Sequence, residues 1–93
     1  MIEGNASPYW VTVPMTYATA AQLLVLGKAL ITGAETVFDL SRVSAADSSA
    51  LSVILGWQRA AGQGRIRLTN PPESIRSLAE LYGIADMLPL PSA

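Results

Sequence analysis

VFDLSRVSAADSSALSVILGWQRAAGQGRIRLTN, residues 37–70, is the stretch that decides the fold. Its beginning completes a short apolar run, Thr36–Leu40, whose β-branched and aromatic residues predict a buried strand. A second run of this kind, Ile66–Thr69, lies near its end. The residues between the two runs have helical periodicity, so the stretch predicts a strand, helix, strand unit, a connection that is nearly always parallel.

The helix of this unit has a recognisable start and end. Asp47 is placed to act as its N-cap, because its carboxylate can accept the free backbone N–H groups of Ser49 and Ala50. The helix should run to about Ala61. Gly62 then ends it, since glycine takes the left-handed conformation that is common just past a helix end.

Two unlike faces emerge when successive residues of this helix are placed about 100° apart. One face is apolar except for a glutamine and should be buried: Ala50, Ile54, Trp57, Gln58 and Ala61, flanked by Leu51 and Val53. The opposite face, called the small face below, consists of Ser48, Ser49, Ser52, Gly56 and Arg59. A solvated helix face normally carries long charged residues of high helix propensity. We therefore interpret the small face as a docking surface; the alternative is that the serines only cap the first turn and Gly56 packs against a neighbour.

The motifs of this stretch resemble the signature of the STAS domain family. The matching residues, in order, are Asp39-Leu40-Ser41, Asp47-Ser48-Ser49-Ala50-Leu51 and Val53-Ile54-Leu55-Gly56. The resemblance covers about Tyr9 to Pro89 and implies an α/β fold: one domain over residues 1–93, with a mixed sheet of about four strands and about four helices packed on it. Ala50 departs from the family, which usually has glycine there.

One branch of the family is favoured by two segments, Asp39–Val43 and Ser77–Pro89, which resemble MlaB. This likeness implies a non-enzymatic, cytoplasmic accessory subunit of an ABC transporter similar to MlaFEDB, peripheral at the inner membrane through its partner. It would bind and support the MlaF-like ATPase subunit, and indirectly the permease, in phospholipid transport that maintains outer-membrane lipid asymmetry. In MlaB-like proteins a hydroxyl at the position of Ser48 lies in the ATPase contact.

The second branch consists of anti-sigma factor antagonists similar to SpoIIAA, whose pattern is close to Ser48-Ser49 and Leu51–Gly56. That likeness implies phosphorylation of Ser49 by a partner serine kinase, itself an anti-sigma factor. A phosphate on Ser49 would be repelled by Asp47 and would spoil close docking, so the unmodified form would bind and the phosphorylated form would be released. Both functions remain open at this point, with the transport subunit favoured. Weaker alternatives are a plain oligomerisation module and direct binding of a lipid or small ligand in an apolar cleft around Leu23, Leu26 and Trp57, residues that a buried core explains more simply.

Composition narrows the remaining classes of function. The chain has 93 residues, enough for one domain, and only 14% of them are charged, against roughly 25% in an average soluble domain. Such a surface indicates protein partners. The net charge of -1 gives no long-range attraction for nucleic acid. No apolar run is long enough to span a membrane, and MIEGNASPYW lacks the features of a signal peptide, which favours a cytoplasmic protein.

Catalysis and metal binding are not expected. The chain contains no histidine and no cysteine, which removes the usual zinc ligands and the commonest bases and nucleophiles. Asp39 and Asp47 could form an acid–base pair, but each has a structural reason to exist, at a strand and at a helix cap. We therefore expect no enzymatic activity, no catalytic residue, no metal and no cofactor.

The N-terminal half outside the central stretch is expected to contain a frayed segment, a strand and an apolar helix. Met1–Pro8 should fray and Tyr9–Val13 should form a strand. STAS domains usually begin with two strands, so one is short or missing here, which leaves an edge for a second copy of the chain or a partner and makes a homodimer conceivable. Thr16 or Thr19 should cap the next helix, about Ala18–Leu30. A helix this apolar is either well covered or part of an interface, and we expect it to be mostly covered.

The C-terminal part is expected to contain a helix that begins near Pro72 and closes at Gly83. Its buried stripe should consist of Ile75, Leu78, Ala79 and Tyr82, which recur at helical spacing. A last short helical turn is expected within Ile84–Leu88.

Overall fold

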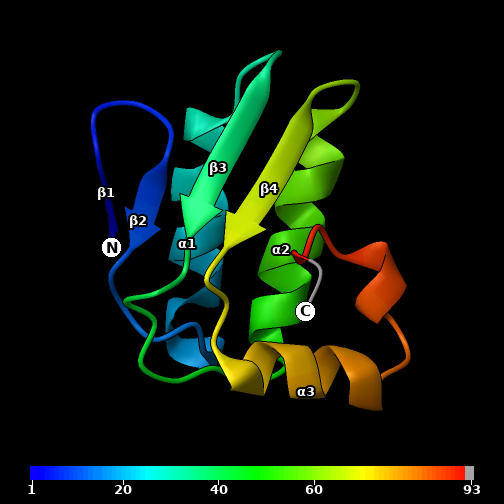
Figure 1. Cartoon of the computed structure of the whole chain (residues 1–93). Helices are drawn as coiled ribbons and strands as arrows, with labels where there is room; N and C mark the ends of the chain where they lie inside the picture. The colour runs from blue at the N-terminus through cyan, green and yellow to red at the C-terminus, as the bar shows by residue number, and fades with distance from the viewer. Residues whose placement is uncertain (92–93) are drawn as a thin grey trace.

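The computed structural model describes residues 1–91 as a four-stranded sheet with three α-helices and a short 3-10 helix (Figure 1). In chain order the elements are β1 (Ile2–Glu3), β2 (Tyr9–Val11), α1 (Tyr17–Leu30), β3 (Glu35–Asp39), α2 (Ser49–Ala61), β4 (Arg65–Thr69), α3 (Glu73–Leu81) and η1 (Ala85–Met87). The expected α/β fold is confirmed, although η1, not a fourth α-helix, follows α3.

The sheet is mixed, with its strands in the order β1-β2-β3-β4. β1 is antiparallel to β2, whereas β2, β3 and β4 run parallel to one another. Helices α1 and α2 form the two connections between these parallel strands, and both lie behind the sheet in the view of Figure 1. The predicted strand, helix, strand unit is therefore β3-α2-β4.

Successive side chains along the strands alternate between a buried face of the sheet and a solvent-exposed face. Phe38 of β3 and Leu68 of β4 pair in register and are fully buried beneath the helices. On the other face Arg67 lies 4.0 Å from the Glu35 carboxylate, with both side chains largely exposed. The molecule is thus a two-layer domain, and its core fills the space between the sheet and α1 and α2.

The beginning of the chain is more ordered than expected. Ile2 and Glu3 pair with β2, and the Met1 carbonyl accepts the Thr12 N–H at 2.8 Å and the Thr12 hydroxyl at 3.1 Å. The prediction that Met1–Pro8 frays is wrong for Met1, Ile2 and Glu3. These residues are ordered because their backbone groups pair with the edge of β2, whose N–H and C=O groups would otherwise lack partners. The strand expected to be short or missing is present and short.

Helices α1 and α2 fit together by two reciprocal contacts between a glycine and a large side chain. Gly27 of α1 lies against the indole of Trp57, where a Cβ atom would overlap the ring. Gly56 of α2 lies against Leu24, whose Cδ1 would be 2.5 Å from an added Cβ. Each helix therefore receives a side chain of the other at a glycine.

Trp57 is fully buried at the centre of the core, as its angular position on the helix predicts. Its indole stacks on the ring of Phe38, with 4.2 Å between ring centroids, and its Nε1 donates a hydrogen bond of 3.1 Å to the Leu23 carbonyl. The only polar atom of this side chain is thereby paired, which removes the cost of burying it.

The expectation that α1 is mostly covered is wrong. Only Leu23 and Gly27 of this helix are buried, whereas Tyr17, Val25 and Leu26 are 86%, 67% and 44% exposed. The physical reason is that α1 is apolar on all sides, so any face that meets the core leaves another apolar face in solvent.

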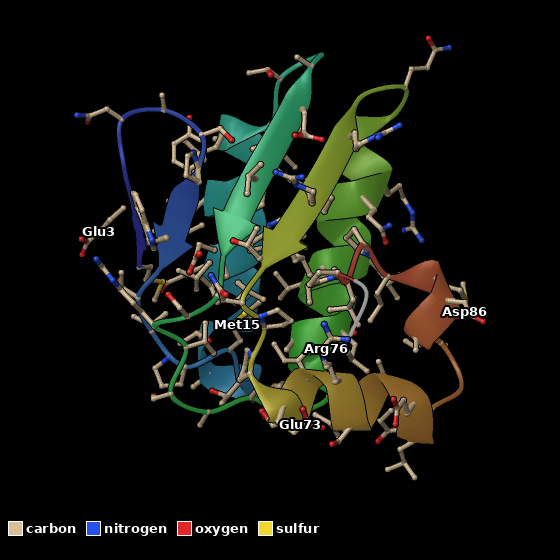
Figure 2. The ribbon with its side chains drawn as sticks, in the orientation of Figure 1. Glu3, Met15, Glu73, Arg76 and Asp86 are labelled. Carbon is tan, nitrogen blue, oxygen red and sulfur yellow. The ribbon has the colours of Figure 1, made fainter. Side chains whose placement is uncertain are left out.

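Helix α3 packs across the end of α2 through Ile75 and Ala79, both buried as predicted (Figure 1). Tyr82, predicted to complete this stripe, is 57% exposed, because α3 ends at Leu81 and the chain turns at Gly83 with φ +69°. Arg76 faces the C-terminal segment and donates to the Pro91 carbonyl at 2.7 Å (Figure 2).

Within residues 1–91 no helix has the length and apolar character needed to cross a membrane.

Candidate functional site

The start of α2 is positioned by the segment that follows β2. Met15, buried in the core, bridges to Ala46: its N–H donates to the Ala45 carbonyl at 2.9 Å, and its carbonyl accepts the Asp47 N–H at 3.2 Å. The loops that leave β2 and β3 thus run side by side for a short distance. This pairing brings Asp47 beside the first residue of α1.

Asp47 links the starts of both helices through its two carboxylate oxygens. Oδ1 accepts the Ser49 N–H at 2.8 Å, and Oδ2 accepts the Tyr17 N–H at 3.0 Å. These donors hold the pKa of Asp47 below its usual 3.8, the Tyr17 N–H contributing most and the Ser49 N–H next. The Ala50 N–H, expected to donate to this carboxylate, donates instead to the Asp47 carbonyl at 3.0 Å. The hydrogen bond from Tyr17 of α1 to Asp47 joins residues that are 30 positions apart, so no local sequence pattern could predict it.

The residues of the small face, which run from the N-cap residue Ser48 along α2, differ in how far they are buried. Ser48, Ser52 and Arg59 are exposed, whereas Ser49 and Gly56 are half-buried. The nearest neighbour of Gly56 is Leu24 of the same chain, so the alternative interpretation, in which this glycine serves internal packing, describes the contact that the structure shows. A partner can therefore reach the two exposed serines and the arginine directly.

Two grooves border this exposed part of α2. The α1–α2 groove has a volume of about 610 Å³ and is lined by Leu24, Lys28, Ser52, Leu55, Gly56, Arg59 and Ala60. The α2–Tyr82 groove, of about 370 Å³, is lined by Ser48, Leu51, Ser52, Leu55, Tyr82 and Ile84. Ser52 and Leu55 line both grooves, so they form a ridge between them.

Seven residues that line the grooves were not part of the predicted small face: Leu24, Lys28, Leu51, Leu55, Ala60, Tyr82 and Ile84. Leu55 could have been found, because it follows Ser48 by seven positions and Ser52 by three and so lies on the same side of the helix. Leu24, Lys28, Tyr82 and Ile84 belong to other segments, and only the tertiary fold places them beside α2.

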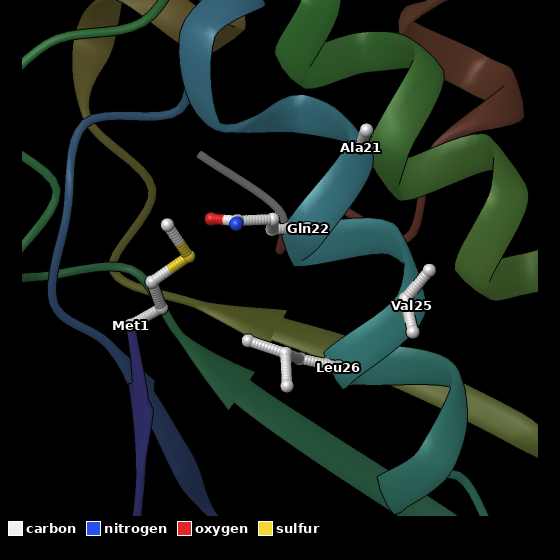
Figure 3. Close-up of a pocket in the computed structure, with 5 residues that line it drawn as sticks. All are labelled: Met1, Ala21, Gln22, Val25 and Leu26. Carbon is white, nitrogen blue, oxygen red and sulfur yellow. The ribbon is translucent and has the colours of Figure 1, made fainter.

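A third hollow lies on the outer side of α1, with a volume of about 560 Å³. Figure 3 shows the residues that line it: Met1, Ala21, Gln22, Val25 and Leu26. The lining has no charged side chain. Leu23 and Trp57 are not part of this hollow, since both are fully buried in the core.

Asp39, at the end of β3, is hydrogen-bonded to the end of β4. Its Oδ2 accepts the Thr69 hydroxyl at 2.8 Å and the Asn70 side-chain amide at 2.9 Å, and its Oδ1 accepts the Ser41 N–H at 2.8 Å. Partial burial raises the pKa of Asp39, but the hydrogen bonds from Ser41, Asn70 and Thr69 outweigh it and lower the pKa to about 2. A carboxylate so acidic is a weak base, so its arrangement serves structure.

The Ser49, Ala50 and Leu51 backbone N–H groups at the start of α2 donate to acceptors within the chain. The Ser49 N–H donates to the Asp47 carboxylate, and the Leu51 N–H donates to the Ser48 carbonyl at 3.1 Å. A phosphate on Ser49 that used these donors would have to displace Asp47.

No group of three or more acidic, histidine or cysteine side chains in residues 1–91 is arranged to hold a metal ion.

Solved structures of SpoIIAA are among those that share the fold of this chain. Unphosphorylated SpoIIAA, an anti-sigma factor antagonist, matches with a TM-score of 0.72 and 19% identity, over 100% of this chain and 86% of SpoIIAA. The phosphorylated form of SpoIIAA, a Bacillus cell fate determinant, matches with a TM-score of 0.67 and 18% identity, over 100% of this chain and 89% of that one. Identities this low show the fold alone.

Sequence comparison supplies the family. Among curated protein sequences none matches the chain. The family model described as "Mlab, STAS domain" matches residues 11–89, which includes β3, β4, both helices that cover the sheet, and the whole surface around Ser48 and Ser52. The resemblance noted from the motifs of residues 39–56 is thereby confirmed, and the chain belongs to the STAS domain family described as Mlab.

Proposed function

We propose that this protein is a non-enzymatic accessory subunit that binds the ATPase subunit of an ABC transporter for phospholipid. The observation that carries the proposal is the match of residues 11–89 to the family named for Mlab, since the likeness to SpoIIAA extends only to the fold. In this role the protein lies on the cytoplasmic side of the inner membrane and reaches the permease through the ATPase. It contributes binding, and its partner hydrolyses the nucleotide.

The surface around α2 suits such a role. Ser48 and Ser52 are exposed and small, so a partner can approach the helix closely, and Leu55 supplies apolar area between two grooves. Small residues bordered by hollows allow the close packing that stable interfaces require. We assign the ATPase contact to the exposed Ser48, Ser52 and Arg59, with Gly56 supporting the fit from within.

The test is to place a charge at this surface and measure binding to the purified ATPase subunit of the host. Ser52→Glu and Ser48→Arg should each weaken binding by at least about thirty-fold, because a buried, unpaired charge costs about 2 kcal/mol or more. Ser77→Glu, the same change at an exposed position of α3, is the matched control and should bind normally. If both α2 variants bind as well as the control, the assigned surface is wrong.

A second candidate function, a phosphorylation-controlled anti-sigma factor antagonist, is favoured by the fold shared with SpoIIAA and by the serine at the start of α2. It predicts phosphate on Ser49 in protein recovered from its host and a serine kinase as the bound partner. Mass spectrometry of the purified protein measures the first, and affinity purification the second. An unmodified Ser49 under every growth condition, together with recovery of an ABC ATPase, would eliminate this candidate.

A further inference from the structure

The α1–α2 groove combines apolar walls with two cations from different helices. Leu24 and Leu55 line it, and Lys28 of α1 and Arg59 of α2 contribute its charges. No carboxylate is among its lining residues. Its volume of about 610 Å³ leaves room for more than one side chain of a partner.

Neither cation has a carboxylate partner in the part of the chain that the structure describes. The ion pairs found there join Arg42 to Glu3 and Arg67 to Glu35. Lys28 and Arg59 each lie in the last turn of a helix, where the negative end of the helix dipole favours a positive charge. The dipole accounts for a cation at each helix end, but it does not account for both cations bordering one groove.

We propose that the α1–α2 groove binds an acidic segment of the ATPase subunit. An apolar side chain of that segment packs between Leu24 and Leu55, and carboxylates on either side of it pair with Lys28 and Arg59. This inference rests on the proposed function and adds the chemistry of the partner to it. Ser52, Gly56 and Arg59 line the groove and also belong to the small face. One partner therefore covers both surfaces.

The hollow on the outer side of α1 does not compete for this role. Val25 and Leu26 leave it apolar, and none of its lining side chains carries a charge (Figure 3). The two grooves beside α2 differ from it because they are continuous with the surface assigned to the ATPase.

The experiment measures binding of the purified ATPase subunit to single charge-reversal variants at low and at high salt. Lys28→Glu and Arg59→Glu should each weaken binding about ten-fold at low salt, and less at high salt, because salt screens charges near a surface. Arg65→Glu is the matched control: this residue is exposed on β4 and does not line the groove. The unfolding midpoint of each variant verifies that the fold is retained.

A charge-swap adds a positive result. In the ATPase subunit, each exposed Asp or Glu is changed to Arg, and at least one such variant should restore binding to Lys28→Glu or Arg59→Glu. If both reversal variants bind as Arg65→Glu does, the acidic-segment inference is overturned while the proposed function stands. A loss of binding that is equal at all salt concentrations and is rescued by no swap also overturns it. If the unmodified protein does not bind the ATPase at all, the proposed function fails, and this inference fails with it.

Discussion

Helices α1 and α2 cover the same face of the same sheet, yet they use their apolar residues in opposite ways. Helix α2 buries five residues, Trp57 among them, and leaves a polar, small-residue side in solvent. Helix α1 has the more apolar sequence, but it buries only Leu23 and Gly27 and exposes Val25 and Leu26. The periodicity of apolar residues, and not their number, determines how much of a helix is covered.

The comparison also shows that the two helices are held by different means. α2 contributes the large side chain at the centre of the core, whereas α1 contributes a glycine, a backbone carbonyl and Leu24 to the joint between them. α1 thus acts mainly as a surface against which α2 packs. Mutations that separate these roles should give very unequal losses of stability.

The largest effect is expected for Trp57→Ala, compared with Val25→Ala. The first change removes a fully buried indole and should cost about 4 kcal/mol of the roughly 5 to 15 kcal/mol that stabilises a small domain. The second removes an exposed side chain and should change the free energy of unfolding by less than about 0.5 kcal/mol. Urea unfolding measures both, and equal losses would contradict the contrast between the helices.

An intermediate effect is expected for Gly27→Ala, compared with Gly56→Ala. The new methyl group at Gly27 meets the Trp57 ring, which is fixed by Phe38 and by its own hydrogen bond, so we expect a loss of about 2 kcal/mol after the better helix propensity of alanine is counted. At Gly56 the methyl group meets the end of a flexible leucine, which can rotate, so the net change should stay within about 1 kcal/mol of zero. Unfolding midpoints measure both changes. A larger loss at Gly56 would mean that Leu24 is the more rigid of the two partners.

The smallest effect is expected for Asp47→Asn, which weakens the acceptor shared by the two helices. The pKa of this carboxylate is lowered by the Tyr17 and Ser49 N–H groups, so the ionised form stabilises the folded state. That contribution is complete above the ordinary pKa of 3.8 and is lost as the pH falls through the lower value of the folded protein. Thermal unfolding of the variant should therefore differ from that of the unmodified protein at neutral pH and converge with it in strong acid. Asp86→Asn, at an exposed position in η1 (Figure 2), is the control and should unfold like the unmodified protein at neutral pH.

The sequence was sufficient for the parts of the fold that depend on local pattern. The strands at β3 and β4, the helix between them and the core position of Trp57 follow from periodicity over a few residues, and the structure agrees. The hydrogen bond from the Ser49 N–H to Asp47 could be predicted because the two residues are only two positions apart, although the structure places Ser48, and not Asp47 as predicted, at the N-cap position of α2. The second donor to Asp47, Tyr17, depends on the Met15 to Ala46 bridge, which joins distant segments and has no pattern of its own.

The predictions that failed concern residues whose environment is decided by other elements. The burial of α1 could not be deduced, because a helix that is apolar on all sides gives no indication of which side meets the core. A glycine such as Gly56 looks the same whether it makes room for a partner protein or for Leu24. Tyr82 has the spacing of the buried stripe, but α3 ends one residue before it. For the candidate site, the sequence identified the serines of α2 but not the walls of the grooves beside them.

The ridge formed by Ser52 and Leu55 has a further consequence for recognition. Its two grooves are completed by Leu24 and Lys28 on one side and by Tyr82 and Ile84 on the other, so the surface is assembled from three distant parts of the chain. An unfolded chain or an isolated α2 peptide does not present it. A partner that straddles the ridge therefore selects the folded form by mass action and adds its own binding free energy to the stability of the domain.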